Sequence, residues 1–271
     1  MRVLLTNDDG IGAAGLQALR RALLEVPGVT LAVIAPSSNQ SATARSITTR
    51  RPLEVTEVRF EDGTAGYAAD GTPVDCVRFA QLGLVEGFVP DVVVSGVNHG
   101  SNLGDDITYS GTVAAALEAV VLGLPGIAVS QQSRARELGF RVGRRFDFGV
   151  SARFAARIVG ALGEMPLPRG TLLNVNVPDG EPQGVEVARL GKRIYHDELA
   201  LVEENGERRT YRIYGDDPDH EREEGTDLAA VADGRIAVTP IHFDLTDRAG
   251  LEALRGYDLG RLVAPAARGA E

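Results

Sequence analysis

The sequence has one cysteine and lacks any long apolar run, and each shortage excludes a class of protein. With Cys76 alone among 271 residues, an internal disulfide and a cysteine-rich zinc site are both excluded. A run of about 18 apolar residues is needed for a membrane-spanning helix, and none occurs. The apolar run at residues 3–5 is too short for a signal peptide. We therefore expect a cytoplasmic protein without a membrane segment.

Basic residues are also in deficit. The chain has 28 Lys and Arg against 38 Asp and Glu, a formal net charge of −10. A nucleic-acid polymer binds to a basic face, so such a partner is not expected. A single nucleotide is compatible with this charge, because one local site can be positive inside an acidic protein. Carboxylates can hold an anion only through a metal ion, so an anionic ligand bound by carboxylates would require a bound metal ion.

Apolar segments and helical segments alternate through the first two thirds of the chain. The 44% hydrophobic content is ample for a core. We expect strands at residues 2–6, 29–35, 90–95 and 125–130 and helices at 15–24, 112–122 and 146–162. Strands that are apolar on both faces and alternate with helices are typical of a mostly parallel sheet covered on both sides. The sequence thus predicts an α/β catalytic core over residues 1–180.

The remaining residues, 181–271, change in character. After a strand expected at residues 171–177, at the end of the core, further strands are expected at 185–190, 208–214 and 235–241. We interpret a charged stretch at 215–225 as a solvated loop or an arm. A strand-rich extension on an α/β core often mediates contact between subunits. We interpret residues 181–271 as a C-terminal extension with an oligomerisation arm, packing back on the core.

Two adjacent carboxylates, Asp8 and Asp9, follow the first expected strand. In open α/β sheets, ligands bind at the carboxyl ends of the strands. Neighbouring carboxylates repel each other there and are costly to desolvate, and a divalent cation resolves that conflict. Alternatively, one of the two acids caps the following helix and the other faces solvent.

The same turn continues into a glycine-rich loop, GIGAAG, from Gly10 to Gly15. Its spacing is that of the dinucleotide-binding fingerprint. That fingerprint expects an acid about 20 residues on, at the end of the second strand, where VIAPSSN at residues 33–39 has none. Asp8 and Asp9 would also face a pyrophosphate directly. A dinucleotide-binding Rossmann protein that uses this loop is therefore the alternative hypothesis.

A second polar loop, SGVNHGSNLG, follows the strand at residues 90–95. Asn98 can offer a carbonyl oxygen to a hard cation. His99 has the chemistry of a general acid, although a single histidine is more often incidental. The next helix opens with YSGT at residues 109–112. Exposed N–H groups and hydroxyls at a helix N-terminus suit a phosphate, but Ser110 or Thr112 would serve equally as an N-cap.

Three other features have plainer interpretations. The segment SSNQS at residues 37–41 follows the second strand and is an ordinary turn unless it supplies a ligand. We interpret the acidic pair Asp105 and Asp106 as part of a solvated loop, or alternatively as residues that shape the site. Cys76 lies on a helix expected to start at Thr72, with Pro73 in its first turn, and is interpreted as buried packing.

Taken together, these segments resemble the SurE survival-protein family. The motifs are LLTNDDGI (4–11), AP with NQS (35–36, 39–41), GTPVDC (71–76), SGVN with NLGDD (95–98, 102–106), YSGTVAAA (109–116), GTD (225–227) and VTPI (238–241). They occur in order over residues 2 to about 247, and the block at 95–116 is long and specific.

The resemblance implies a metal-dependent 5′/3′-nucleotidase that hydrolyses nucleoside monophosphates and, in some relatives, short polyphosphate. It implies a Rossmann-like core and a C-terminal arm exchanged between subunits of a homodimer or homotetramer. One Mg²⁺ or Mn²⁺ per subunit would be held by Asp8, Asp9, Ser41 and Asn98. Phosphate would be bound by Asn98, Ser110, Gly111 and Thr112.

The chain departs from the family pattern in the loop before Ser41. Ser37 and Ser38 replace the usual acid and arginine, and Ala42 replaces a glycine. These changes leave the implied ligands intact and bear on substrate preference. A bound ion would supply Lewis-acid polarisation of a phosphoryl oxygen and a more acidic water. Asp8 and Asp9 are the expected catalytic residues, as metal ligands or alternatively as nucleophile or general base.

Overall fold

A mostly parallel sheet forms the centre of the molecule. The computed structural model describes residues 1–138, 145–196, 198–213, 219–221 and 223–263. In this part of the chain, nine strands join in the order β3-β4-β2-β1-β5-β6-β7-β13-β8. Their bounds are β1 (Arg2–Thr6), β2 (Thr30–Pro36), β3 (Val55–Arg59), β4 (Ala65–Ala69), β5 (Val92–His99), β6 (Gly126–Gln131), β7 (Thr171–Val177), β8 (Val185–Val187) and β13 (Ile236–His242).

The central strands are parallel and buried. β4, β2, β1, β5, β6 and β7 pair in parallel, whereas β3 and β13 run antiparallel to β4 and β7. Every residue of β6 and β7 is buried, as expected for central strands covered on both faces, and Gln131, Asn174 and Asn176 are buried polar residues within them. The predicted α/β fold with a parallel sheet is confirmed.

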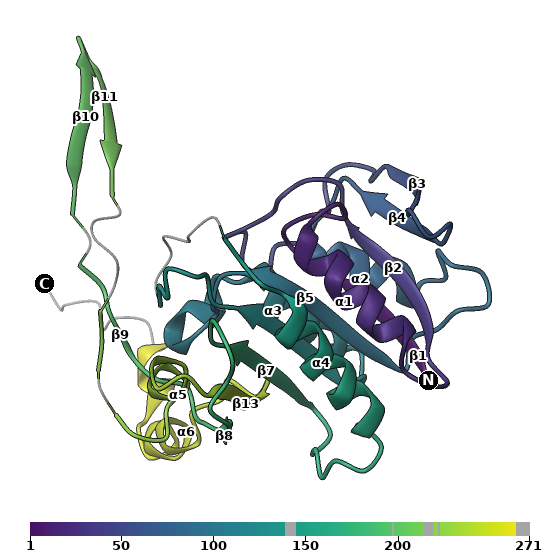
Figure 1. Cartoon of the computed structure of the whole chain (residues 1–271). Helices are drawn as coiled ribbons and strands as arrows, with labels where there is room; N and C mark the ends of the chain where they lie inside the picture. The colour runs from purple at the N-terminus through teal and green to yellow at the C-terminus, as the bar shows by residue number, and fades with distance from the viewer. Residues whose placement is uncertain (139–144, 197, 214–218, 222, 264–271) are drawn as a thin grey trace, which may run out of the picture.

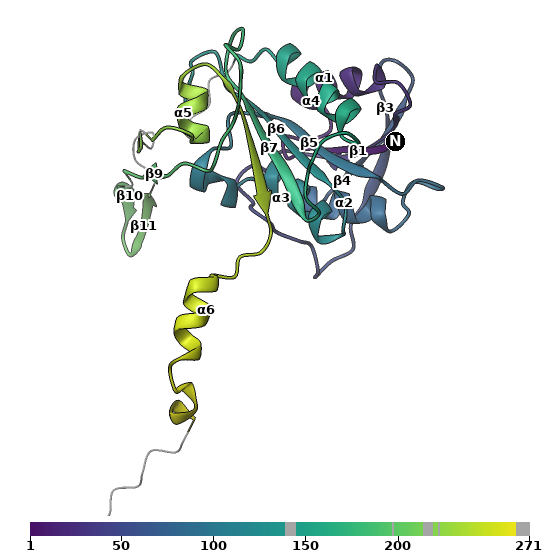
Figure 2. The same ribbon diagram turned by 90° about the horizontal axis from the view of Figure 1, so that it is seen from below.

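Helices cover both faces of the sheet (Figure 2). On one face α1 (Ala14–Leu24) packs against α4 (Gly149–Ala161), and on the other α2 (Pro73–Gln81) packs against α3 (Gly111–Val121). The start of α2 follows its sequence signals, with a capping box between Thr72 and Asp75 and Pro73 in the first turn. Cys76 on this helix is fully buried, as expected.

The C-terminal part contributes to the sheet and also projects from it. β8 and β13 add two strands to the sheet, and α5 (Asp227–Ala232) packs beside β13. A hairpin of β10 (Ala200–Asn205) and β11 (Arg208–Arg212) stands away from the body (Figure 1). At its root β9 (Arg193–Ile194) pairs with β12 (Asp219–His220). The division of the chain into two domains at residue 180 stays a prediction.

The last elements extend in another direction. Helix α6 (Arg248–Arg255) and the short 3-10 helix η2 (Leu259–Leu262) lead away from the sheet (Figure 2), and neither has a buried residue. No helix in the described part of the chain combines the length and apolar character that crossing a membrane requires.

Several sequence-based bounds need correction. β8 ends at Val187 rather than at residue 190, and β5 continues through His99, beyond the expected end at residue 95. β11 ends at Arg212, and residue 214 of the expected strand lies outside the described residues. Residues 215–218 and 222 of the charged stretch at 215–225 lie outside them as well.

Candidate active site

The predicted site residues converge because parallel strands end at one edge of the sheet. β1 lies between β2 and β5, and Thr6 stands opposite Ser95 in the register. The residues that follow Thr6 therefore lie beside those that follow Ser95. The loop after β2 joins them through a hydrogen bond of 2.8 Å from the N–H of Ile11 to the carbonyl oxygen of Pro36.

Asp8 lies against the first turn of α3 and is only 3% exposed. The hydroxyl of Thr112 donates a hydrogen bond of 2.5 Å to its Oδ1 atom. A Cβ at Gly111 would come within 2.8 Å of the Oδ2 atom, so this close approach requires glycine. Burial, and then the charge of Asp9, raises the pKa of Asp8 to about 6, although the Thr112 bond opposes the shift.

Asp9 is held from two sides. The backbone N–H of His99 donates to its Oδ2 atom at 3.1 Å, and the side-chain amide of Asn39 donates to Oδ1 at 3.5 Å. The Asp9 side chain is 6% exposed. Burial raises the pKa of Asp9 to about 6, and the hydrogen bond from His99 works against that rise.

The two acids place negative charge where little solvent can screen it. Within the described residues, neither acid pairs with a lysine or arginine, and the nearest basic group is the His99 ring, whose Nδ1 lies 3.7 Å from Asp9 Oδ1. Burial lowers the pKa of His99, with the charge of Asp8 opposing, so this ring is neutral near pH 7. The chemistry of this donor set fits a divalent cation, which prefers oxygen ligands.

A cation here would need neutral oxygen ligands besides the two carboxylates. No group of three or more His, Cys, Asp and Glu side chains with metal-binding placement occurs in the described part of the chain. Asn98 suits this role, because its amide nitrogen donates to the carbonyl oxygen of Gly100 at 2.8 Å. That bond leaves its Oδ1 atom with the chemistry of a ligand.

The loop after β2 comes next to Asp8 through its backbone, and the Ser41 side chain in this loop is exposed. The N–H of Gln40 donates to the carbonyl oxygen of Asp8 at 2.6 Å, and the N–H of Ser41 donates to Asn39 Oδ1 at 2.8 Å. Asn39 is the side chain of this loop that contacts Asp9. It belongs to the NQS motif, but no sequence signal distinguished it as a site residue.

The same loop is tied to α3. The N–H of Ala44 donates to the carbonyl oxygen of Tyr109 at 3.1 Å. Arg45 forms an ion pair of 2.6 Å with Glu118, whose side chain is 1% exposed. These contacts connect the candidate ligand loop with the helix that starts at Gly111.

The start of α3 combines capping with site residues. Ser110 is the N-cap, and its hydroxyl accepts a hydrogen bond of 3.1 Å from the N–H of Val113. The N-cap interpretation therefore holds for the Ser110 side chain, while Gly111 and Thr112 contact Asp8. Because a carboxylate already occupies this helix end, a phosphate would need a cation between the two negative groups.

The interpretation of Asp106 as a solvated side chain is wrong. Asp105 is exposed, but Asp106 is 5% exposed and pairs with the fully buried guanidinium of Arg193 at 2.6 Å. Tyr195 donates to the other Asp106 oxygen at 3.0 Å. Both acids lie on the 3-10 helix η1 (Gly104–Thr108), which ends two residues before Ser110. The root of the projecting arm is thus joined to the segment before α3.

Asn102 anchors the loop after β5 and was missed as a positioning residue. Its side chain donates to Ser130 at 2.8 Å, and its carbonyl oxygen accepts bonds of 2.9 Å from both Asn174 and Asn176. All four side chains are buried. The NLG motif drew attention to the segment, but its partners lie on β6 and β7, far away in the sequence.

The glycines from Gly10 to Gly15 serve the turn and the packing of α1. Gly10 has a φ of 104°, which favours glycine, and a Cβ at Gly15 would clash with the carbonyl oxygen of Val97. The end of β2 brings no acid to this loop, since it is followed by Ser37 and Ser38. The arrangement lacks the ribose-binding acid that a dinucleotide site requires.

The sequence of this chain is similar to those of known proteins. The chain matches the family described as "Survival protein SurE" over residues 3–197. It is 55% identical over 266 residues to the "5′-nucleotidase SurE" of Rubrobacter xylanophilus, covering 97% of this chain and 99% of the relative. The protein of that name from Herpetosiphon aurantiacus is 46% identical over 250 residues, covering 91% and 94%.

A solved structure is similar over the same extent. The crystal structure of the SurE protein from Aquifex aeolicus superposes with a TM-score of 0.77 at 34% sequence identity. The similarity covers 94% of this chain and 99% of that one.

Proposed function

The chain belongs to the SurE survival-protein family, as its motifs predicted, and from that premise we propose that it is a divalent-metal-dependent 5′-nucleotidase. It is a phosphoric monoester hydrolase that converts nucleoside monophosphates to nucleoside and phosphate. The observation that carries this function is the buried pair Asp8 and Asp9 beside the start of α3, with no lysine or arginine partner among the described residues. Dinucleotide binding by the loop from Gly10 to Gly15 is not favoured.

One Mg²⁺ or Mn²⁺ per subunit would be held by oxygen atoms of Asp8, Asp9, Ser41 and Asn98. Oxygen-only ligands suit these hard cations better than zinc. When bound, the ion supplies Lewis-acid polarisation of a phosphoryl oxygen and increases the acidity of a coordinated water.

The protein's own residues bind and orient around that centre. Thr112 fixes the rotamer of Asp8 through its 2.5 Å hydrogen bond, and the backbone of His99 fixes Asp9. Asn98 and the turn Ser110, Gly111 and Thr112 would bind the phosphate, which needs a cation there because the Asp8 carboxylate already occupies this helix end. Asp8 and Asp9 would hold this cation, or alternatively one of them would act as nucleophile or general base.

A metal-dependence assay tests this function. Purified protein is treated with EDTA, dialysed, and assayed for phosphate release from adenosine 5′-monophosphate with and without Mn²⁺ or Mg²⁺. Activity is expected only after a divalent ion is restored. Full activity in EDTA, or none with either ion, would contradict the proposal. Parallel assays with adenosine 3′-monophosphate and with short polyphosphate measure the wider substrate range predicted from the sequence.

We also propose that the chain forms a homodimer or homotetramer through its C-terminal elements. Apolar side chains of α6 and η2 are exposed by 41–68%, namely Leu251, Leu254, Leu259 and Leu262. An apolar surface of this kind marks a contact with another protein surface. An exchanged arm that packs α6 on a second subunit would bury it.

Light scattering tests the assembly. The Leu251→Ser/Leu254→Ser double variant is expected to shift the oligomer to a smaller mass, whereas the matched change Leu82→Ser at an 84% exposed site on the body leaves the mass unchanged. A monomeric wild-type protein would contradict the assembly without touching the nucleotidase proposal. The cytoplasmic location stays a prediction.

A further inference from the structure

Three aromatic rings form a cluster beside the two acids. The ring of His99 lies 5.2 Å from that of Phe146 and 4.9 Å from that of Phe148, between centroids. The two phenylalanine rings are 5.4 Å apart. All three planes are within 26° of parallel, a geometry typical of offset stacking.

The cluster adjoins Asp9 directly. His99 bonds Asp9 through its backbone N–H at 3.1 Å, and its ring nitrogen Nδ1 is 3.7 Å from Asp9 Oδ1. The His99 side chain is 31% exposed, and both phenylalanines are half-buried. Part of this aromatic surface is therefore accessible next to the candidate metal site.

The body of the protein holds the cluster in place. Phe148 is the N-cap residue of α4 and packs against the main core. A Cβ at Gly15 would come within 3.2 Å of the Phe148 ring, so the absence of a side chain at Gly15 makes room for it. Segments far apart in the sequence, the end of β5 and the start of α4, thus present one aromatic surface.

We propose that Phe146, with His99 and Phe148, forms the surface on which the nucleobase of the substrate stacks. This inference rests on the proposed nucleotidase function. The phosphate of a nucleoside monophosphate would lie at Asp8, Asp9 and the start of α3. Its base would then lie one ribose away from that phosphate, and the aromatic cluster that adjoins Asp9 is within reach of it. Every base has a π-face, so stacking recognises nucleotides as a class.

Substrate pairs that differ only in the base test this role. The kcat/KM for adenosine 5′-monophosphate is divided by that for ribose 5-phosphate, which has the same phosphate and sugar but no base. If one of the two compounds is not hydrolysed, its inhibition constant as a competitive inhibitor is measured and used in place of its kcat/KM. Phe146→Leu keeps an apolar side chain but removes the π-face. We expect it to lower the ratio about fivefold or more, mainly through KM.

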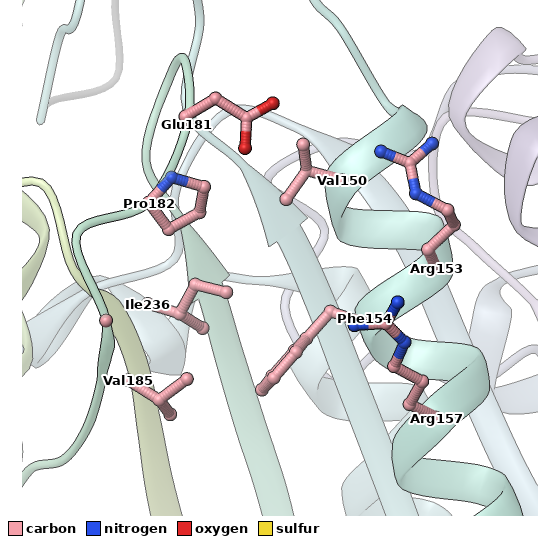
Figure 3. A pocket seen from close by; sticks show the side chains of 9 residues that line it. Val150, Arg153, Phe154, Arg157, Glu181, Pro182, Val185 and Ile236 are labelled. Carbon is pink, nitrogen blue, oxygen red and sulfur yellow. The ribbon is translucent and has the colours of Figure 1, made fainter.

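Two further variants control for structural effects. Phe146→Tyr restores an aromatic ring and is expected to restore the wild-type ratio. Phe154→Leu makes the same substitution on α4 at a separate cavity of about 320 Å³, where Phe154 points toward Ile236 and Val185 (Figure 3). That change is expected to leave the ratio as it is in the wild type.

The outcomes separate the two proposals. Parallel losses on both substrates in Phe146→Leu would mean that the ring acts only on the scaffold, and an unchanged ratio would mean that no base contacts it. Either result overturns the stacking surface and leaves the nucleotidase function standing. A wild-type protein that hydrolyses neither substrate with a divalent ion would refute the nucleotidase function, and the stacking proposal with it.

Discussion

Replacing Asp9 by asparagine should stabilise the metal-free protein while removing its response to metal. Asparagine has nearly the same shape and still accepts the hydrogen bond from His99, but it carries no charge. Burial raises the pKa of Asp9 from 3.8 to about 6. A shift of about two pH units, at 1.36 kcal/mol each, gives a penalty of about 3 kcal/mol for the charged form near pH 7. Solvent screening reduces this little, because the side chain is 6% exposed.

The pH dependence has a defined sign. Since the native pKa lies above the unfolded one, the native state binds more protons in this window, and stability falls as pH rises from about 4 to about 6. Above that window the full penalty is present. In EDTA, the free energy of unfolding of Asp9→Asn should exceed that of the wild type by up to about 3 kcal/mol at pH 7 and should fall less with pH.

Chemical unfolding in EDTA and in excess Mn²⁺ measures both effects. At a Mn²⁺ concentration of about 100 times Kd, binding should stabilise the wild type by about 2.7 kcal/mol and Asp9→Asn far less. Asp62→Asn is the matched control, because hydrogen bonds from Thr64 and Arg20 lower the pKa of Asp62 to about 2. This control should lose stability and keep the response to Mn²⁺. A metal-free Asp9→Asn protein no more stable than the wild type would refute the reasoning.

Three further predictions concern the surroundings of the site. Gly111→Ala places a Cβ 2.8 Å from Oδ2 of Asp8, and the displaced carboxylate should lower kcat/KM for a nucleotide by about 100-fold. Arg193→Met leaves Asp106 buried without its partner and should lower the free energy of unfolding by about 3–5 kcal/mol, measured by urea titration. Burial raises the pKa of the Cys76 thiol, so iodoacetamide should label it only after unfolding, as seen by mass spectrometry.

Each of these predictions has a contradicting result. Normal activity in Gly111→Ala would show that the contact with Asp8 is unimportant, and circular dichroism must show a folded variant. The exposed pair Arg235 and Glu186 provides the control for Arg193, since Arg235→Met should change stability by less than about 1 kcal/mol. Equal losses of unfolding free energy in Arg193→Met and Arg235→Met would contradict the role of burial. Rapid alkylation of Cys76 in the native protein would show that its thiol is accessible.

Local signals predicted the elements that place the site. Apolar runs indicated the buried strands, and Thr72 with Pro73 indicated the start of α2. Because parallel strands end at one edge, the acids after β1 and Asn98 at the end of β5 could be placed together from their sequence positions alone. These inferences need only the spacing of apolar residues along the sequence and the geometry of a parallel sheet.

Pairings between distant residues could not be predicted in this way. Asp106 pairs with Arg193 and Glu118 pairs with Arg45, at sequence separations of 87 and 73, and Glu118 also pairs with Arg78. A charged residue that is buried in an ion pair looks in the sequence like one that faces water. The aromatic cluster could not be predicted from the sequence either, because His99 and Phe146 come into contact only when β5 and α4 pack together.

Crystals grown with Mn²⁺ test whether Asp8 and Asp9 are tolerated in a buried position because they hold a divalent cation. Crystals grown with Mn²⁺ should give an anomalous peak at the manganese edge, about 2–2.6 Å from an oxygen of each carboxylate and from Asn98 Oδ1. Absence of that peak at full Mn²⁺ concentration, with both acids contacting only water, would contradict the account.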